Sequence, residues 1–234
     1  MSSFEFKQFT INQKGAPFKV GTDSLIFGAW LRLIGTETVL DIGTGTGVLA
    51  LMTAQNLTVG RVLAIEPERE AFLIAEQNVS SSAFRHAVVM VNEPLQRIAP
   101  NAPFDLIISN PPYFSHSTKN TKASSTRARH TESLQFLDIV KFSSQWLKPE
   151  GKLAVVLPYE ESKVFQSLME EKEFFLVREL QISSFENTTV KRRCLEFSRI
   201  KSGLFSELLA IRDKESGVYS KDYKRLTKEY HLKL

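Results

Sequence analysis

Cysteine and long hydrophobic runs are almost absent from this chain of 234 residues. A single cysteine, Cys194, excludes an internal disulfide and a multi-cysteine metal site, and suits a small buried side chain in a reducing compartment. No apolar run approaches the roughly 20 residues that cross a bilayer. The first residues also lack the basic and apolar segments of a signal peptide. We therefore expect a cytoplasmic protein without a membrane anchor.

Charge is nearly balanced, with 30 Lys and Arg against 26 Asp and Glu, a net charge of +4 and a pI of about 9.1. Such a mild excess suits a polyanionic partner without requiring one. The length, with 42% hydrophobic residues, is enough for one well-buried α/β domain and short for two. We expect one domain.

Apolar runs alternate with helical patterns along the first two thirds of the chain. This alternation is typical of βαβ units and a doubly wound parallel sheet, and the continuous apolar runs suit strands that are covered on both faces. Strands are predicted over 38–43, 61–66, 86–91, 104–109 and 152–158, and helices over 23–34, 46–56, 68–79 and 132–146. The segment 148–151, KPEG, is predicted as a turn before the fifth strand.

The pattern changes after residue 160. A helix to about residue 171 is followed by two strand-like runs, 174–183 and 193–200, with no long helix between them. We expect an antiparallel pair at the edge of the sheet. The last segment indicates a strand over 206–211 and a charged helix.

A glycine-rich segment, DIGTGTG over 41–47, leaves the first predicted strand and opens a helix. Its glycines permit a tight turn and close approach of a ligand to the backbone. The dinucleotide fingerprint needs a glycine where this chain has Val48, and no Gly-Lys-Ser/Thr follows for a phosphate loop. The pattern predicts a nucleotide-like ligand without a pyrophosphate; the alternative is an ordinary turn.

An acid, Glu66, ends the second predicted strand, where a carboxylate can accept hydrogen bonds from both hydroxyls of an adenosine ribose. Asp41, close to the glycine segment, suits a ligand that carries an ammonium or sulfonium charge. S-adenosylmethionine has all of these parts. The alternative is that Glu66 is only a solvated acid at a helix start.

The fourth predicted strand ends in SNPPYF, residues 109–114. The Asn110 side-chain oxygen and the Pro111 carbonyl can hold the two N–H groups of a planar amine or amide and stabilise the charge that develops on methylation. Pro112 fixes the local backbone, and Tyr113 offers a ring on which a base can stack. Alone, NPPY would be a turn; beside the glycine segment and Glu66 it predicts transfer of a methyl group to nitrogen.

The chain resembles class I S-adenosylmethionine-dependent methyltransferases with an NPPY motif, and in particular the bacterial family that methylates the adenine N6 of valine tRNA at position 37. The resemblance runs almost end to end, through FKQFTI (6–11), FKVGTDSLIFGAW (18–30), LDIGTGTGVLALMTAQ (40–55), AIEPE (64–68), SNPPYF (109–114), RARHTESL (127–134) and YSKDYKRLTKEYHLKL (219–234). It implies a Rossmann-like, seven-stranded, mostly parallel sheet with antiparallel edge strands. It also implies an N-terminal extension (1–36) that closes the cofactor site, a core (37–200) and a tail (201–234).

The motifs and the resemblance together predict a set of site residues. The cofactor-binding set is Lys19, Thr22, Asp23, Asp41, Gly43, Thr44, Gly45, Gly47, Glu66 and Glu93, and the catalytic set is Asn110, Pro111, Pro112 and Tyr113. Glu93 departs from the family pattern, which has an Asp after the third strand to read the cofactor's adenine.

The span 106–131 contains several basic residues and no acidic one. Such a segment can hold RNA phosphates while the target base is turned into the pocket. The predicted RNA-binding residues are Lys119, Lys122, Arg127, Arg129, His130, Lys191, Arg192 and Arg193. No residue cluster predicts a metal. The expected partner is tRNA, and nothing in the sequence requires more than a monomer.

Three alternatives stay open on the sequence alone. A protein glutamine N5-methyltransferase acting on release factors would use the same NPPY chemistry, but this chain lacks a long N-terminal helical domain and has a basic loop. A ribosomal RNA methyltransferase would share the fold. A non-catalytic, cofactor-sensing RNA-binding module would leave the intact NPPY motif without an explanation.

Overall fold

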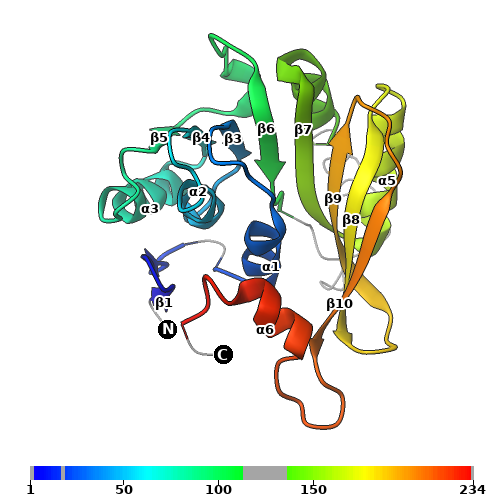
Figure 1. Cartoon of the computed structure of the whole chain (residues 1–234). Coiled ribbons are helices and arrows are strands. Elements are labelled where there is room, and N and C mark those ends of the chain that lie inside the picture. The colour runs from blue at the N-terminus through cyan, green and yellow to red at the C-terminus, as the bar shows by residue number, and fades with distance from the viewer. Residues whose placement is uncertain (1–2, 17–18, 113–135, 233–234) are drawn as a thin grey trace, which may run out of the picture.

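The computed structural model describes residues 3–16, 19–112 and 136–232, and its centre is a mixed sheet of eight strands (Figure 1). The strand order is β10-β8-β9-β7-β6-β3-β4-β5. The bounds are β3 Thr38–Ile42, β4 Arg61–Ile65, β5 Val88–Val91, β6 Phe104–Ser109, β7 Leu147–Pro158, β8 Phe175–Phe185, β9 Val190–Ser198 and β10 Phe205–Arg212. The order reverses between β3 and β6, the place where doubly wound sheets bind ligands.

Strands β5, β4, β3, β6 and β7 run parallel, and β9 lies antiparallel to both β7 and β8. The predicted antiparallel pair is therefore confirmed. The C-terminal segment predicted as a strand pairs in parallel with β8 and adds an eighth strand, β10, to the seven that the resemblance implied.

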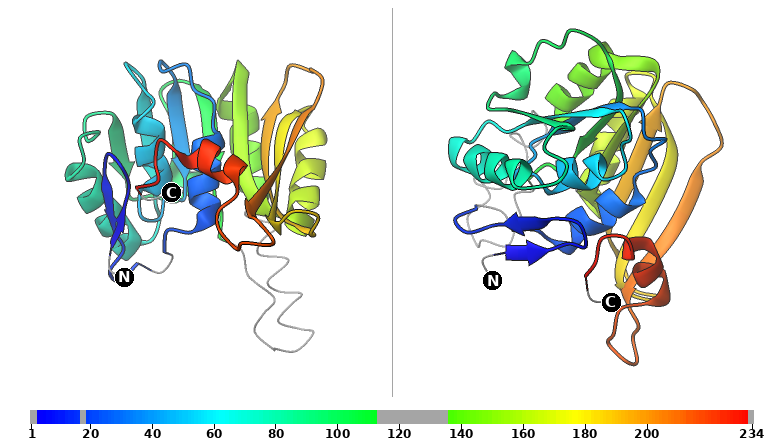
Figure 2. Two further views of the ribbon diagram at one scale, coloured as in Figure 1. Left: turned by 60° about the horizontal axis from the view of Figure 1, so that its bottom comes forward. Right: turned by 60° about the vertical axis from the view of Figure 1, so that its left-hand side comes forward.

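Two hydrophobic clusters, one on each face, hold the sheet. On one face lie α1 (Thr22–Trp30), α2 (Val48–Ala54) and α6 (Lys221–Thr227), with α3 (Arg69–Ser80) along the β5 side (Figure 2). The other face is covered by α5 (Tyr159–Glu170) and a helix over residues 136–146. Successive residues of a strand face opposite sides, so Val39 joins the first cluster while Leu40 and Ile42 join the second.

An N-terminal hairpin, β1 (Ser3–Glu5) and β2 (Thr10–Asn12), is attached to α3 and to the glycine loop. The Asn78 side chain accepts from the Asn12 N–H and donates to the carbonyls of Asn12 and Thr46, each at 2.9 Å. The Lys7 N–H donates to the Tyr230 carbonyl at 3.0 Å, so the two ends of the chain meet (Figure 1).

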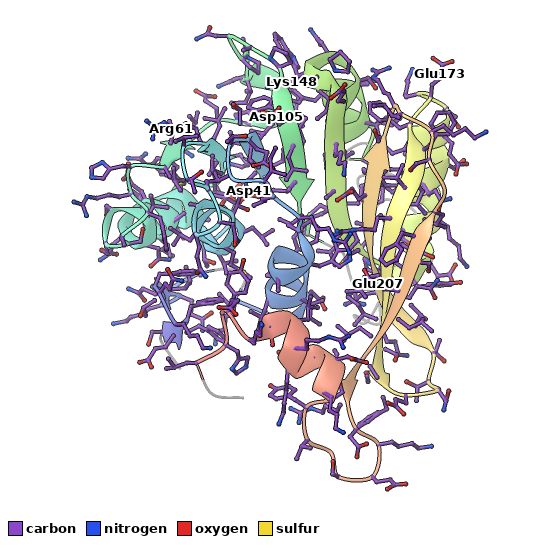
Figure 3. The ribbon with its side chains drawn as sticks, viewed as in Figure 1. Asp41, Arg61, Asp105, Lys148, Glu173 and Glu207 are labelled. Carbon is purple, nitrogen blue, oxygen red and sulfur yellow. The ribbon has the colours of Figure 1, made fainter. Side chains whose placement is uncertain are left out.

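Two local predictions are wrong. Helix α1 ends at Trp30 rather than residue 34, and residues 148–151 are not a turn ahead of a strand but part of β7. The register jumps from Phe104 opposite Leu147 to Leu106 opposite Lys152, so these residues bulge out of the ladder. Lys148 Nζ lies 2.7 Å from Asp105 Oδ1 and ties the bulge to β6 (Figure 3).

Candidate active site

The predicted motifs meet at the carboxyl ends of three adjacent parallel strands. Ile42, the last residue of β3, is opposite Ile65 of β4 on one side and Ser109 of β6 on the other. Gly43, Glu66 and Asn110 each follow directly after one of these strands. Strand pairing therefore places the start of the glycine loop, the acid and the amide at one edge of the sheet.

The glycine loop has the backbone that its sequence predicts. Gly43, Gly45 and Gly47 have φ of 70°, 59° and 82°, a region that other residues rarely adopt. A Cβ at Gly43 or Gly45 would meet no atom within 4 Å, so this part of the loop faces open space, whereas a Cβ at Gly47 would lie 3.5 Å from Ala75 of α3. The first two glycines leave room for a ligand and the third packs against a helix.

Glu66 is held by the backbone around it. Its Oε2 accepts from the Gly45 N–H at 2.9 Å and its Oε1 from the Glu68 N–H at 3.0 Å, while the residue is 7% exposed. Each oxygen has a further lone pair for a ribose hydroxyl. Asn92, which sequence reasoning missed, donates from Nδ2 to the Glu66 carbonyl at 2.8 Å and supports this corner.

Asp41 lies inside the protein, on the α2 side of β3 (Figure 3). It is 0% exposed, and its Oδ2 accepts from the Thr44 hydroxyl at 2.6 Å. Burial, opposed by this hydrogen bond, raises the pKa of Asp41 to about 7. The hydrogen bond between Asp41 and Thr44 shapes the loop, and the cofactor contact expected of both residues stays a prediction.

Asn110 and the residue before it are held by hydrogen bonds to α1 and to the end of β3. Its Nδ2 donates to the Ser24 hydroxyl of α1 at 2.9 Å, and the preceding Ser109 hydroxyl donates to the Ile42 carbonyl at 2.9 Å. Pro111 is buried and Pro112 is exposed. Tyr113 lies outside the described residues. In Figure 1 the end of β6 meets α1.

An ion pair joins Asp23, in the first turn of α1 and predicted to bind the cofactor, to Arg192 of β9, predicted to bind RNA. Asp23 Oδ2 accepts from Arg192 Nε of β9 at 2.9 Å. Thr22, the first residue of α1, is exposed, and so is Lys19 just before it. The ion pair fastens this segment to the antiparallel part of the sheet.

The other residues predicted to make contacts differ in how exposed their side chains are. Glu93 is half-exposed and lies 3.4 Å from Arg97, whereas its neighbour Asn92 turns toward Glu66. Lys191 is exposed, but Arg193 is 8% exposed and its Nη2 lies 2.6 Å from Glu179 Oε2. This inward placement speaks against the RNA contact predicted for Arg193. The remaining predicted RNA-binding residues lie outside the described part of the chain: Lys119, Lys122, Arg127, Arg129 and His130.

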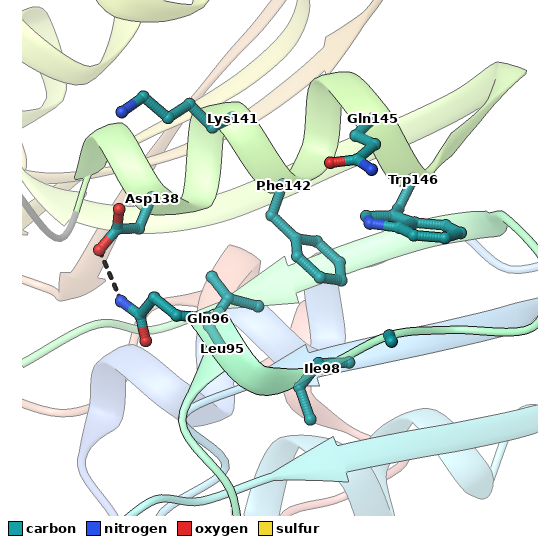
Figure 4. A pocket seen from close by; sticks show the side chains of 9 residues that line it. Leu95, Gln96, Ile98, Asp138, Lys141, Phe142, Gln145 and Trp146 are labelled. Atoms are coloured by element: carbon teal, nitrogen blue, oxygen red, sulfur yellow. Dashed lines mark hydrogen bonds between the residues drawn. The ribbon is translucent and has the colours of Figure 1, made fainter.

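A hollow of about 350 Å³ lies elsewhere, between the 3-10 turn η1 (Leu95–Arg97) and the helix over 136–146 (Figure 4). Gln96 Nε2 donates to Asp138 Oδ2 across it at 2.6 Å, and Phe142 and Trp146 line it. None of the predicted site residues lines this hollow. Within the described ranges there is no group of His, Cys, Asp or Glu suited to a metal and no helix long and apolar enough to cross a membrane.

The sheet order and this site define a class I S-adenosylmethionine-dependent methyltransferase: open space before Gly43 and Gly45, the oriented carboxylate of Glu66, and Asn110 at the next strand end fit the cofactor and its substrate. The family model described as methyltransferase small domain matches residues 19–180. The chain is 35% identical to a tRNA1(Val) (adenine(37)-N6)-methyltransferase of Pseudoalteromonas translucida over the whole of both chains. It belongs to this family.

A second relative of the same name, from Trichodesmium erythraeum, is 36% identical and covers 99% of this chain and 98% of its own. Among solved structures, a predicted O-methyltransferase from Agrobacterium tumefaciens superposes with a TM-score of 0.71 at 15% identity, covering 89% of this chain and 96% of its own. At that identity the likeness concerns the fold alone, and it agrees with the predicted class.

Proposed function

We propose that this enzyme transfers a methyl group from S-adenosylmethionine to the exocyclic N6 of adenine 37 in tRNA1(Val), as the names of its full-length relatives state for them. It acts as a monomer in the cytoplasm. The observation that carries the proposal is the position of Asn110, one strand away from the glycine loop and two strands from Glu66 at the same sheet edge.

The cofactor site is formed by the glycine loop and the acid of the next strand. The open backbone of Gly43 and Gly45 accepts the cofactor, and Glu66, already oriented by two N–H groups, takes the ribose hydroxyls. Thr22 and Lys19 approach from the N-terminal side. When bound, S-adenosylmethionine supplies an electrophilic methyl group on a sulfonium.

The catalytic part of the site is the end of β6. The adenine amine is a poor nucleophile because its lone pair is delocalised into the ring. Asn110 Oδ1 and the Pro111 carbonyl accept its two N–H groups, draw the nitrogen toward tetrahedral geometry and stabilise the positive charge that develops. The extra proton leaves after transfer, so the chain need not provide a general base in the first step.

Label transfer tests the proposal directly. Purified enzyme is incubated with methyl-labelled cofactor and, separately, with unmodified tRNA1(Val), the same tRNA with guanine at position 37, ribosomal RNA and a release factor. We expect label in the first substrate alone. Label in the release factor would replace the proposal with the glutamine methyltransferase, and label in the position-37 variant would move the target to another base.

Two basic residues of β9, Lys191 and Arg193, allow the contributions to RNA binding and to stability to be tested separately. Lys191→Ala should weaken tRNA binding, with a salt slope smaller by about one and no change in the thermal midpoint, because the exposed side chain only neutralises phosphate. Arg193→Met should keep the salt slope but lower the free energy of unfolding by about 3–5 kcal/mol, because it leaves Glu179 buried without its cation. Binding titrations between low and moderate salt, with urea unfolding of both variants, check this; a changed slope for Arg193→Met would restore that residue to the RNA contact.

A further inference from the structure

We infer that Ser24 is a positioning residue for methyl transfer: its hydroxyl holds the NH2 end of the Asn110 amide, so that the amide oxygen is turned toward the substrate amine. The inference rests on the proposed function of Asn110 and adds a residue that none of the sequence motifs assigns to the site. Its basis is a hydrogen bond of 2.9 Å between residues 86 positions apart in the chain.

The chemistry requires one particular face of the amide. An asparagine side chain accepts through its oxygen and donates through its nitrogen, and a half-turn about its last torsion exchanges the two. The substrate amine brings N–H groups and therefore needs the oxygen. Since oxygen and nitrogen lie on opposite sides of a planar amide, a hydrogen bond from Nδ2 to Ser24 leaves Oδ1 on the side away from α1.

Ser24 is suited to this part because it is itself well fixed. It is 8% exposed and lies in the first turn of α1, whose next residues, Leu25, Ile26 and Phe27, are at most 2% exposed in the core. The preceding residue, Asp23, is fastened to Arg192 at 2.9 Å. The helix therefore has anchors that do not involve the Ser24 hydroxyl.

Helix formation gives no separate reason for a serine here. Alanine has the higher helix propensity, so replacing Ser24 costs the helix nothing by itself. Ser24 does not cap α1 either, since the N-cap is Gly21 and no side chain caps the helix there. The interaction that Ser24→Ala removes is the one with Asn110, and its effect belongs to catalysis rather than to folding.

The test compares Ser24→Ala with Ser24→Thr, which keeps a hydroxyl. We expect Ser24→Ala to lower kcat on tRNA1(Val) roughly ten- to a hundredfold, the loss that small misplacements of a reacting group produce. The KM for tRNA, the cofactor Kd from calorimetry and the thermal midpoint should stay within about twofold or a few degrees. Ser24→Thr should recover most of kcat. Unchanged kcat in Ser24→Ala, or loss of cofactor binding with it, would overturn the inference.

A second readout works without any methyl acceptor, so that failure of the proposed substrate leaves Ser24 testable. The side-chain NH2 resonances of Asn110 are assigned in the 15N spectrum as those lost in Asn110→Ala. In Ser24→Ala these resonances should shift, because the NH2 group has lost the Ser24 hydroxyl as its acceptor; unchanged resonances would refute the hydrogen bond itself.

Ser220→Ala is the matched control. Ser220 also lies at a helix start, where its hydroxyl accepts from the Tyr223 N–H at 3.0 Å and caps α6. Its loss should lower the thermal midpoint and leave kcat and the Asn110 resonances unchanged. A control that lowered kcat as much as Ser24→Ala would assign both effects to general destabilisation.

Discussion

Asn110→Ala is expected to lower kcat for tRNA methylation by about 100- to 1,000-fold, the usual loss when one group that stabilises developing charge is removed. The substitution takes away the oxygen proposed to hold the amine, while the glycine loop and Glu66, proposed to bind the cofactor, stay as they are. Cofactor Kd should change by less than about twofold, because no interaction with the ground-state cofactor is lost. Single-turnover rates and calorimetry measure the two quantities separately.

Asn110→Asp refines this experiment. A carboxylate keeps two acceptor oxygens of the same reach, so this variant should exceed Asn110→Ala in kcat while remaining below the wild type. Asn56→Ala is the control for loss of an amide hydrogen bond outside the site: Asn56, just after the end of α2, donates from Nδ2 to the Met52 carbonyl at 2.9 Å. It should lower stability without a specific loss of kcat. If calorimetry showed the cofactor lost in Asn110→Ala, the assigned role of the amide would be wrong.

Most of the sheet could be predicted because its strands are continuous apolar runs between turn residues. The predicted strand 104–109 coincides with β6, Phe104–Ser109. The bulge at 148–151 could not be predicted, because Lys-Pro-Glu-Gly is turn chemistry wherever it occurs and only the pairing of Phe104 with Leu147 shows that the strand has already begun. Where β10 pairs likewise depends on the free edge of β8.

The positions of the candidate site residues that follow strands could be predicted from the sequence. The direction in which an individual side chain points could not. Glu66 and Asn110 follow strands whose order the fold dictates. The hydrogen bond between Ser24 and Asn110 could not be predicted, because the two residues are 86 positions apart in the chain. Arg193 looked like part of a basic surface cluster with Lys191, two residues earlier and so on the same face of a regular strand. The register of β9 against β8 shifts between Val190 and Arg192, and only the structure shows that Arg193 lies against Glu179.

Asp41→Asn should abolish a large pH dependence of stability. The folded pKa of Asp41, about 7, lies above the value of 3.8 for an unburied Asp. Between these values the unfolded chain has released a proton that the folded chain still holds, so the free energy of unfolding falls as pH rises, by about 1.4 kcal/mol per unit and about 4 kcal/mol in total. Above about pH 7 the contribution levels off. Asparagine cannot ionise, so the free energy of unfolding of the variant should rise relative to that of the wild type over this pH range.

Urea unfolding of both proteins at intervals from pH 4 to pH 8 measures the difference, which should widen with pH and then become constant; parallel curves would show that Asp41 titrates normally. Thr44→Val offers a matched test, since it removes the hydrogen bond that lowers the pKa of Asp41 and should move the plateau to higher pH. The same carboxylate connects stability to function. A cofactor with a sulfonium charge favours ionised Asp41, so cofactor should stabilise the wild type more at pH 8 than at pH 5, and Asp41→Asn equally at both.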